Sequence, residues 1–381
     1  MDCADSWRCP EADSKFSNWI LLSENQTMNR AMVGNWFRGK TTIFGSVLSI
    51  WIVVVNVIVC VAIVAVKETG FTKWYRQSSN ISRSTSWLVV NFSVVQLVIG
   101  AIVVPVTLLT ESAGFWLFGL LPCRLWLMAQ IILVANTFWS LAALTVDLLL
   151  HQMSPVFHRK LTDRKLSMVA LVIFVWGLSG LALVPLWTSF ARNDFVLEEV
   201  CAVSMTKYDA VIFLLSTFLC PASVIVVSGV AILAAEVHAV VRGATSAGKA
   251  FDIETQMSPN AEQRSAKKSV DTIIAAILFV DIFSLVTWSP SFVVNTLVPF
   301  CDGMCVDPGL WTFFLWLGYA NAGLAPILWT IDRAIRSRIG LLFMAIFCRG
   351  SLAEEPGKRV KNAKTGLTSQ RDAMLVRSFE E

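Results

Sequence analysis

Few residues in this sequence could support catalysis or metal binding. The three histidines, His151, His158 and His238, do not occur at the His-x-x-x-His spacing of a helical zinc site. The chain also lacks a Gly-x-Ser-x-Gly nucleophile turn and a glycine-rich phosphate loop. We therefore expect no catalytic residues, no bound metal and no cofactor, and we predict that the protein is not an enzyme.

Asp281 has the most unusual setting of any titratable residue. It interrupts the run Thr272–Cys301, which otherwise contains no charge. Ionisable groups inside membrane segments are costly and commonly functional. Asp281 lies seven residues, two helical turns, before Trp288, so both side chains should face inward from one helix. We hypothesise that Asp281 is a proton- or ion-sensitive element. The simpler alternative is a protonated side chain bonded to a backbone carbonyl.

Seven long apolar runs must position these residues. The chain is 55% hydrophobic and 15% charged, with mean hydropathy +0.64, whereas soluble domains are about 25% charged. A helix needs about 20 apolar residues to cross a bilayer. The runs of sufficient length are Thr41–Val66, Ser84–Thr110, Leu125–Val146, Leu166–Trp187, Ala210–Ala235, Thr272–Cys301 and Pro308–Ile331. They are too long and too continuous for the strands of a β-barrel.

The distribution of positive charge predicts the orientation of this seven-helix bundle. Of the 31 lysines and arginines, 23 fall in segments 67–86, 151–165, 237–268 and 332–381. Basic residues concentrate on the cytoplasmic side of membrane proteins, so the N-terminus should be outside. The sequon at Asn25 then becomes a glycosylation candidate. The net charge of +4 is too small to suggest nucleic-acid binding.

These runs predict an all-α membrane protein, a seven-transmembrane helix bundle with a short interfacial helix after span seven. The stretch before Cys348 is basic and amphipathic, which is typical of such a helix. Cys348 is therefore a palmitoylation candidate, with an unmodified thiol as the alternative. We expect an extracellular tail over 1–40, the seven-helix domain over 41–331, the interfacial helix over 332–348 and a disordered cytoplasmic tail over 349–381.

The nine cysteines divide between the two sides of this topology. Cys123 and Cys201 both lie on the outer side, and Cys301 and Cys305 flank a short outer turn. Because secretory compartments are oxidising, we expect each of these two pairs to form a disulfide. Cys3 and Cys9 are a further possible pair, although spacing alone does not determine connectivity.

The order of motifs along the spans resembles that of class A, rhodopsin-like G-protein-coupled receptors, particularly the biogenic-amine branch. The similarity covers roughly residues 41–350. The residues that carry it are Asn56 in span one, Trp116-Leu-Phe-Gly119 and Cys123 in the first outer loop, Asp147 and Pro155 after span three, Trp176 in span four, Phe218 and Pro221 in span five, Thr287-Trp288-Ser289-Pro290 and Asn295 in span six, and Trp316-Leu-Gly-Tyr-Ala-Asn321 with Pro326 in span seven.

The departures from this pattern bear on the ligand. Amine receptors carry an Asp seven residues after the span-three Cys, where this chain has Gln130. A neutral amide supplies no Coulomb attraction for an ammonium group. The catechol-binding serine positions hold Phe213 and Thr217. Opsin-type retinal attachment is also absent, because Tyr319 occupies the position of the lysine.

The switch positions are altered as well. The Asp-Arg-Tyr motif reads Asp147-Leu148-Leu149, and the Asn-Pro-x-x-Tyr motif reads Ala325-Pro326-Ile327-Leu328-Trp329. Gln96 replaces the sodium-site Asp, and Gly229 and Ser284 replace two further switch residues. The resemblance suggests Asn56, Gln96 and Asn321 as partners of Asp281. This pattern predicts atypical or weak coupling to a G protein.

The resemblance places a ligand cavity among aromatic and amide side chains. Its residues are Trp126, Gln130, Val134, Phe213, Thr217, Trp288, Ser291, Phe292, Asn295, Trp316 and Tyr319. Such a lining suits a small apolar or uncharged ligand, although cation–π contacts can also hold a cation. Acidic outer-loop residues could attract cations too, or simply be solvated: Glu111, Asp194, Glu198, Glu199, Asp302 and Asp307.

The resemblance therefore predicts a plasma-membrane receptor for an unidentified small extracellular ligand. Its partners would be membrane lipid, the ligand, and a heterotrimeric G protein or arrestin. The alternative is a non-signalling seven-helix protein: a decoy, a trafficking partner or a heteromer subunit. A transporter or channel is a third option, but the chain shows no internal repeat and holds one intramembrane carboxylate.

Overall fold

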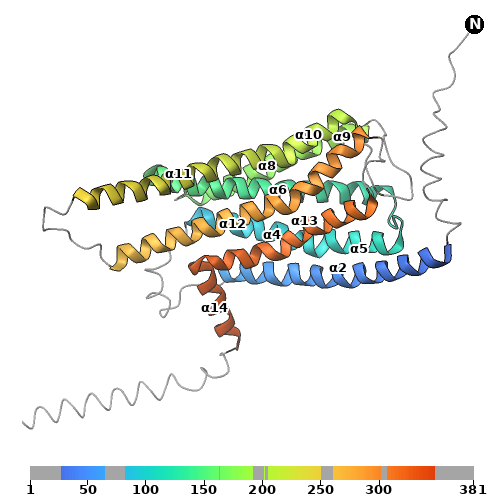
Figure 1. The fold of residues 1–381 in the computed structure, drawn as a ribbon, viewed down its shortest axis with the longest axis horizontal. Helices are drawn as coiled ribbons and strands as arrows, with labels where there is room; N and C mark the ends of the chain where they lie inside the picture. The colour runs from blue at the N-terminus through green and yellow to red at the C-terminus, as the bar shows by residue number, and fades with distance from the viewer. Residues whose placement is uncertain are drawn as a thin grey trace, which may run out of the picture.

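The described residues of the computed structural model form a bundle of helices (Figure 1). They comprise 27–64, 82–162, 164–191, 201, 205–249, 261–301 and 307–347. The α-helices are α2 (Thr27–Val64), α4 (Arg83–Val98), α5 (Val104–Ala113), α6 (Leu120–Met153), α7 (Pro155–Thr162), α8 (Lys165–Gly180), α9 (Val184–Ala191), α10 (Lys207–Leu214), α11 (Cys220–Lys249), α12 (Ala261–Leu297), α13 (Pro308–Leu328) and α14 (Arg333–Phe347).

Seven helical segments are long and apolar enough to cross a membrane, which confirms the predicted bundle. They are Thr41–Val64, Arg83–Ala113, Leu120–Met153, Leu166–Trp187, Lys207–Ala239, Thr272–Phe300 and Gly309–Ile331. Several helices extend past the apolar runs: α2 already begins at Thr27, within the segment expected to be a tail, and α12 begins at Ala261. A helix satisfies its backbone hydrogen bonds internally, so it does not need to end where the lipid ends.

Two spans contain a π-helical turn directly before a proline. The turn η2 (Ile99–Val103) precedes Pro105 in the second span, and η4 (Leu215–Leu219) precedes Pro221 in the fifth. Proline has no backbone N–H, and its ring clashes with the carbonyl four residues earlier. A wider turn at that carbonyl relieves the clash while the helix continues.

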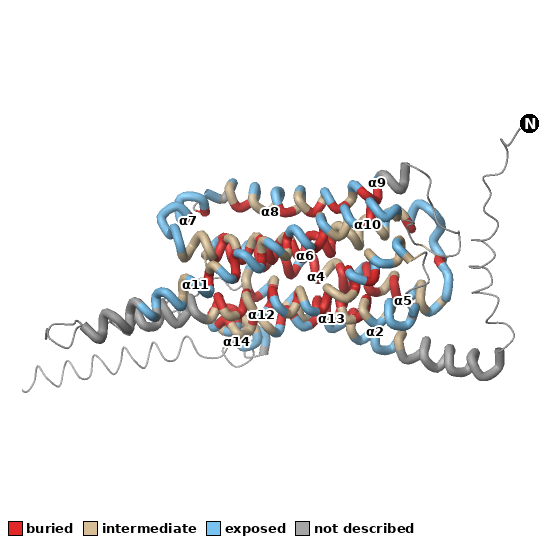
Figure 2. The backbone as a smooth tube through the Cα atoms, turned by 45° about the horizontal axis from the view of Figure 1, so that its top comes forward, coloured by how far each residue is buried: buried red, intermediate tan, exposed pale blue. Residues whose placement is uncertain are grey.

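Apolar side chains fill the bundle in two clusters. The inner cluster, in the half nearer α14, includes Leu141, Leu144, Leu148, Ile277 and Trp329. The outer cluster is built around aromatic rings, among them Phe138, Trp288, Phe292, Trp316 and Tyr319. Buried positions follow the faces that the helices turn toward one another, and exposed positions follow the outside (Figure 2).

The outside of the bundle is apolar too. Ile173, Val227, Ile282 and Val286 are all more than half exposed. In water such a surface would promote aggregation, whereas the lipid tails of a membrane solvate apolar side chains. The exposed apolar surface and the seven spans describe a multi-pass membrane protein.

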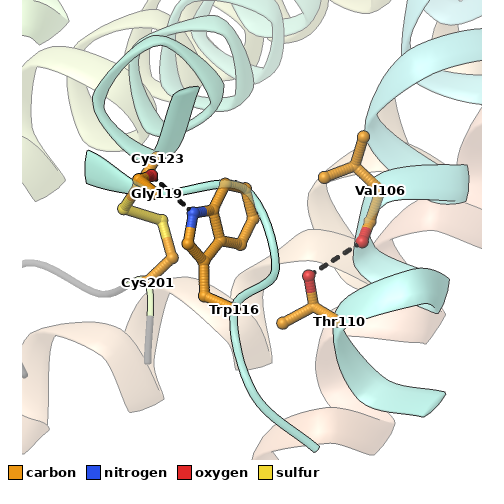
Figure 3. The surroundings of a disulfide bond; sticks show 6 residues. All are labelled: Val106, Thr110, Trp116, Gly119, Cys123 and Cys201. Atoms are coloured by element: carbon orange, nitrogen blue, oxygen red, sulfur yellow. Dashed lines mark hydrogen bonds between the residues drawn. A yellow bond between two sulfur atoms is a disulfide. The ribbon is translucent and has the colours of Figure 1, made fainter. Parts of the chain in front are cut away.

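A disulfide identifies the extracellular end of the bundle. Cys123, near the start of α6, is bonded to Cys201, with the two Cα atoms 5.6 Å apart (Figure 3). Disulfides persist in oxidising compartments. The basic helix α14 lies at the opposite end (Figure 1), so the structure agrees with the orientation predicted from charge. The Cys123–Cys201 pair is confirmed.

The loop before α6 holds this end together. Trp116 Nε1 donates to the carbonyl of Gly119 at 2.7 Å (Figure 3). Gly119 has a φ of 77°, a left-handed conformation that glycine adopts without a steric penalty. The indole and the glycine therefore set the turn that presents Cys123 to Cys201.

Helix α14 follows the seventh span through a capping aspartate. Asp332 Oδ1 accepts from the Ile335 N–H at 2.9 Å, and Oδ2 accepts from Thr272 Oγ1 at 3.2 Å. Burial raises the pKa of the Asp332 carboxyl, and the Ile335 hydrogen bond offsets part of this rise. The cap ties the start of α14 to the cytoplasmic end of the sixth span. Asn25, Cys3, Cys9, Cys305 and Cys348 lie outside the described residues, so the predictions for them stay open.

Close packing between the first two spans should make Gly100→Ala destabilising. A Cβ at Gly100 would lie 2.5 Å from Ile52 Cγ2 and 2.8 Å from Ile52 Cβ. Overpacking of this kind costs about 1–3 kcal/mol. The matched control is Gly177→Ala, where a Cβ meets nothing within 4 Å. Melting of the detergent-solubilised protein should show a clear loss for Gly100→Ala and little change for the control. Equal melting temperatures would contradict this packing.

Candidate ligand site and cytoplasmic switch

The predicted cavity residues come from four helical segments in the outer half of the bundle. The third span contributes Trp126, Gln130 and Val134, the fifth contributes Phe213 and Thr217, the sixth contributes Trp288, Ser291, Phe292 and Asn295, and the seventh contributes Trp316 and Tyr319. The structure brings a central subset of them into contact. Their role in ligand binding stays a prediction.

A directional chain of hydrogen bonds links Gln130 to the second and seventh spans. Thr107 Oγ1 donates to the Val103 carbonyl at 2.9 Å. The Tyr319 hydroxyl lies 3.4 Å from Thr107 Oγ1 and must therefore be the donor, because the single Thr107 proton is already used. Tyr319 in turn accepts from Gln130 Nε2 at 3.0 Å.

This series of hydrogen bonds determines which atom of the Gln130 amide remains available in the predicted cavity. Its amide nitrogen is occupied by Tyr319. Among the residues that the structure describes, no donor reaches the amide oxygen of Gln130. The amide oxygen of Gln130 is therefore a hydrogen-bond acceptor that remains available within the predicted cavity.

Aromatic rings form the wall beside this amide. Phe218 and Phe292 stack with centroids 4.6 Å apart, and Phe138 contacts Phe218 edge-on at 5.1 Å. Trp288 contacts Tyr319 edge-on at 6.2 Å. A Cβ at Gly318 would lie 2.8 Å from the Trp288 ring. Phe138 was not predicted from the sequence, because a phenylalanine in an apolar helix has no distinguishing signal.

Other predicted cavity residues bond elsewhere. Thr217 Oγ1 donates to the Phe213 carbonyl within its own helix. Asn295 donates to the Ser291 carbonyl at 2.8 Å and accepts from Trp311 Nε1 at 3.1 Å. Trp126 packs against Trp116 of the first outer loop, with ring centroids 5.5 Å apart. Within the described part of the chain, Ser291 Oγ and Trp126 Nε1 have no hydrogen-bond partner.

Glu111 belongs to this region rather than to a solvated loop. It lies in α5, one helical turn after Thr107, and both of its oxygens are 3.2 Å from Trp316 Nε1. The spacing of four from Thr107 places the two side chains on one face. Glu111 is thus a carboxylate bonded to Trp316, which is one of the predicted cavity residues.

At the cytoplasmic end, Asp147 pairs with a histidine. Its Oδ1 lies 2.7 Å from His158 Nε2, on α7, and its Oδ2 accepts from Thr85 Oγ1 at 2.8 Å. The His151 ring lies 5.0 Å from the His158 ring, centroid to centroid. No sequence motif pairs His158 with Asp147. Tertiary folding brings α7 back onto the third span and gives Asp147 this partner.

Two other predicted switch residues, Leu148 and Trp329, are buried in the inner apolar cluster. Leu148 is 3% exposed and belongs to the same cluster as Ile232 of α11 and Ile277 of α12. Trp329 is fully buried and contacts Phe92 edge-on at 5.9 Å. Apolar packing therefore closes the cytoplasmic half of the bundle at these two positions.

The expected partners of Asp281 are wrong. Asn56 donates to the carbonyls of Ile52 and Ala322, Gln96 donates to Thr137 Oγ1, and Asn321 donates to Ser284 Oγ and Thr287 Oγ1. Asp281 instead lies 2.8 Å from Thr145 Oγ1 of α6. Ser284 and Thr287 are the residues of α12 that reach α13, whereas Asp281 lies on the side of α12 that meets α6.

Comparison with known proteins agrees with this architecture. The family described as 7 transmembrane receptor (rhodopsin family) matches residues 55–329. The D(1) dopamine receptor of Carassius auratus is 26% identical over 363 residues, covering 85% of this chain and 94% of that receptor. The D(1B) dopamine receptor of Xenopus laevis is 25% identical over 365 residues, covering 88% of this chain and 75% of that receptor.

The Asp147–His158 contact should stabilise the cytoplasmic end. His158→Ala leaves a buried carboxylate oxygen without this partner, which costs about 1–3 kcal/mol. The matched control is His238→Ala, because His238 is exposed on α11. Melting of the solubilised protein should drop by several degrees for His158→Ala alone. If both variants melt like wild type, the contact contributes nothing to stability.

Proposed function

This chain belongs to the rhodopsin family of seven-transmembrane receptors, and we propose that it recognises a small extracellular ligand through Gln130. The family is one of plasma-membrane receptors whose partners in general are small ligands and G proteins. The observation that carries the proposal is the hydrogen-bond chain from Gln130 through Tyr319 to Thr107. It orients the amide so that its oxygen is available to an N–H or O–H of the ligand.

The ligand that suits this site is small, largely apolar and carries a hydrogen-bond donor. Stacked rings such as Phe218 and Phe292 favour a flat or aromatic body. Gln130 carries no charge, so an ammonium placed there would lack a Coulomb attraction of about 4 kcal/mol at 4 Å. The similarity to proteins named as dopamine receptors therefore supports the receptor fold in this proposal, and we do not propose dopamine as the ligand. A cation could still be held by aromatic faces or by Glu111.

Coupling at the cytoplasmic end is proposed to be atypical. Leu148 occupies the position of the family's arginine, and it is buried among apolar residues instead of pairing with Asp147. Asp147 is engaged by His158 and Thr85. A G protein or arrestin would therefore meet a surface without that cation, and α14 would lie along the membrane lipid.

A non-signalling role is the second candidate function. The burial of Leu148 and Trp329 favours it, since both replace polar switch residues with apolar packing. In this case the chain would act as a decoy, a trafficking partner or a heteromer subunit. Coupling assays separate it from the first candidate.

Restoring a carboxylate should convert the site toward amines. Gln130→Asp is expected to bind dopamine about 10- to 100-fold more tightly than wild type, because desolvation offsets part of the new Coulomb attraction. Gln130→Asn is the matched neutral control and should show no such gain. Radioligand competition on membranes measures both. Equal dopamine affinity in wild type and Gln130→Asp would show that residue 130 does not contact the amine.

G-protein activation and arrestin recruitment should be compared in wild type and Leu148→Arg across a broad ligand panel. We expect weak responses in wild type and stronger basal or ligand-driven G-protein activation in Leu148→Arg, because the substitution returns a cation to the cytoplasmic end. Leu148→Met is the control for apolar packing. Strong agonist-driven activation in wild type would contradict both atypical coupling and the non-signalling alternative.

A further inference from the structure

Asp281 and Thr145 form an isolated polar contact in the inner half of the bundle. Asp281 lies on α12 and is 1% exposed, and Thr145 lies on α6 and is fully buried. Asp281 Oδ2 and Thr145 Oγ1 are 2.8 Å apart. The residues before Asp281, Ile277 and Val280, belong to the inner apolar cluster. The contact thus joins two spans in surroundings that offer little solvation.

The Thr145 hydroxyl has two acceptors within reach and one proton to share between them. Thr145 Oγ1 lies 2.8 Å from the Leu141 carbonyl, which can only accept, and 2.8 Å from Asp281 Oδ2. A hydroxyl has one proton to donate. When Thr145 donates to Leu141, the proton between Thr145 and Asp281 must come from the carboxyl group. This arrangement requires a neutral carboxylic acid at Asp281.

The surroundings of Asp281 favour the same protonation state. Its second oxygen, Oδ1, is buried without a hydrogen-bond partner among the residues that the structure describes. If the Asp281 carboxyl were ionised, one hydrogen bond from Thr145 would be the only interaction to stabilise its negative charge. Burying a charge in apolar surroundings with so little compensation is strongly unfavourable. A neutral acid with an unbonded carbonyl oxygen has a far smaller desolvation cost.

No charged neighbour within the described helices compensates Asp281. The titratable groups on the described helices packed against α12 lie elsewhere: Arg124, Asp147 and His151 on α6, Lys207, Tyr208 and Asp209 on α10, Cys220, Glu236 and His238 on α11, Tyr319 on α13, and Asp332, Arg333, Arg336 and Arg338 around α14. Asp147 is paired with His158, Tyr319 with Gln130, and Asp332 with Ile335. Thr145 is the partner of Asp281.

We propose that Asp281 is a neutral acid that donates its proton to Thr145 and latches the sixth span to the third, and that separating these spans releases the proton. Opening would break the hydrogen bond and admit water, in which aspartic acid has a pKa of about 3.9 and ionises. The closed bundle therefore binds one more proton than the open bundle. Rising pH should favour the open form by up to about tenfold per pH unit. The latch requires neither the proposed ligand nor coupling to a G protein.

Infrared spectroscopy of the full chain in lipid nanodiscs tests the protonation state without a ligand. Aspartate labelled with carbon-13 at the side-chain carboxyl distinguishes its C=O stretch from those of other acids. At neutral pH we expect a protonated-aspartate band in wild type that disappears in Asp281→Asn. In Thr145→Val the band should shift to higher frequency, because the acid loses its acceptor. Identical protonated-aspartate bands in wild type and Asp281→Asn, or no labelled band in wild type, would overturn the proposal.

The pH dependence of melting is an independent measurement on the same preparations. Asp281 is neutral in the folded protein and ionised after unfolding, so the folded protein binds more protons and loses stability as pH rises. The melting temperature of wild type should therefore fall relative to that of Asp281→Asn from acid to alkaline pH. Asparagine keeps a donor for Thr145, so this variant should fold. Parallel melting curves across this range would contradict the latch. Neither result bears on the ligand assigned to Gln130.

Discussion

The structure depends on one constraint: in hydrocarbon, every polar group must find its partner within the protein. Backbone groups meet this requirement through seven helices, including the π turns that let Pro105 and Pro221 remain inside spans. Side chains meet it by turning inward. Gln130, Thr107 and Tyr319 form one bonded chain in the outer half, and Asp147, His158 and Thr85 form another group at the cytoplasmic end. The candidate sites lie where these inward-facing groups gather.

The substitutions that set this chain apart from its family are accommodated by local chemistry. Gln130, which stands where the amine-receptor pattern has a carboxylate, donates from its amide nitrogen to Tyr319, and no donor among the described residues reaches its amide oxygen. Leu148 replaces an arginine, and it completes an apolar cluster while Asp147 bonds to His158. Each change removes a charge and retains a packed, bonded structure. Loss of these family motif residues is therefore compatible with an intact fold.

Sequence patterns predicted most of the fold and part of the candidate site. The apolar runs, the Cys123–Cys201 pair and the orientation are properties of the chain's composition and spacing, and the structure agrees with each. Three contacts escaped prediction: Asp281 with Thr145, Asp147 with His158, and Glu111 with Trp316. In each the partners are distant in sequence or lie on different helices, so no spacing along the chain identifies them.

The sequence by itself determined that the protein spans the membrane seven times and which end faces outward, because both follow from where charge is absent and where it is concentrated. Only the tertiary structure decided which polar atoms meet. The rotation of each helix about its axis sets that outcome, and packing against several neighbours at once sets the rotation. Ser284 and Asp281 are three residues apart on α12, yet one bonds to the seventh span and the other to the third.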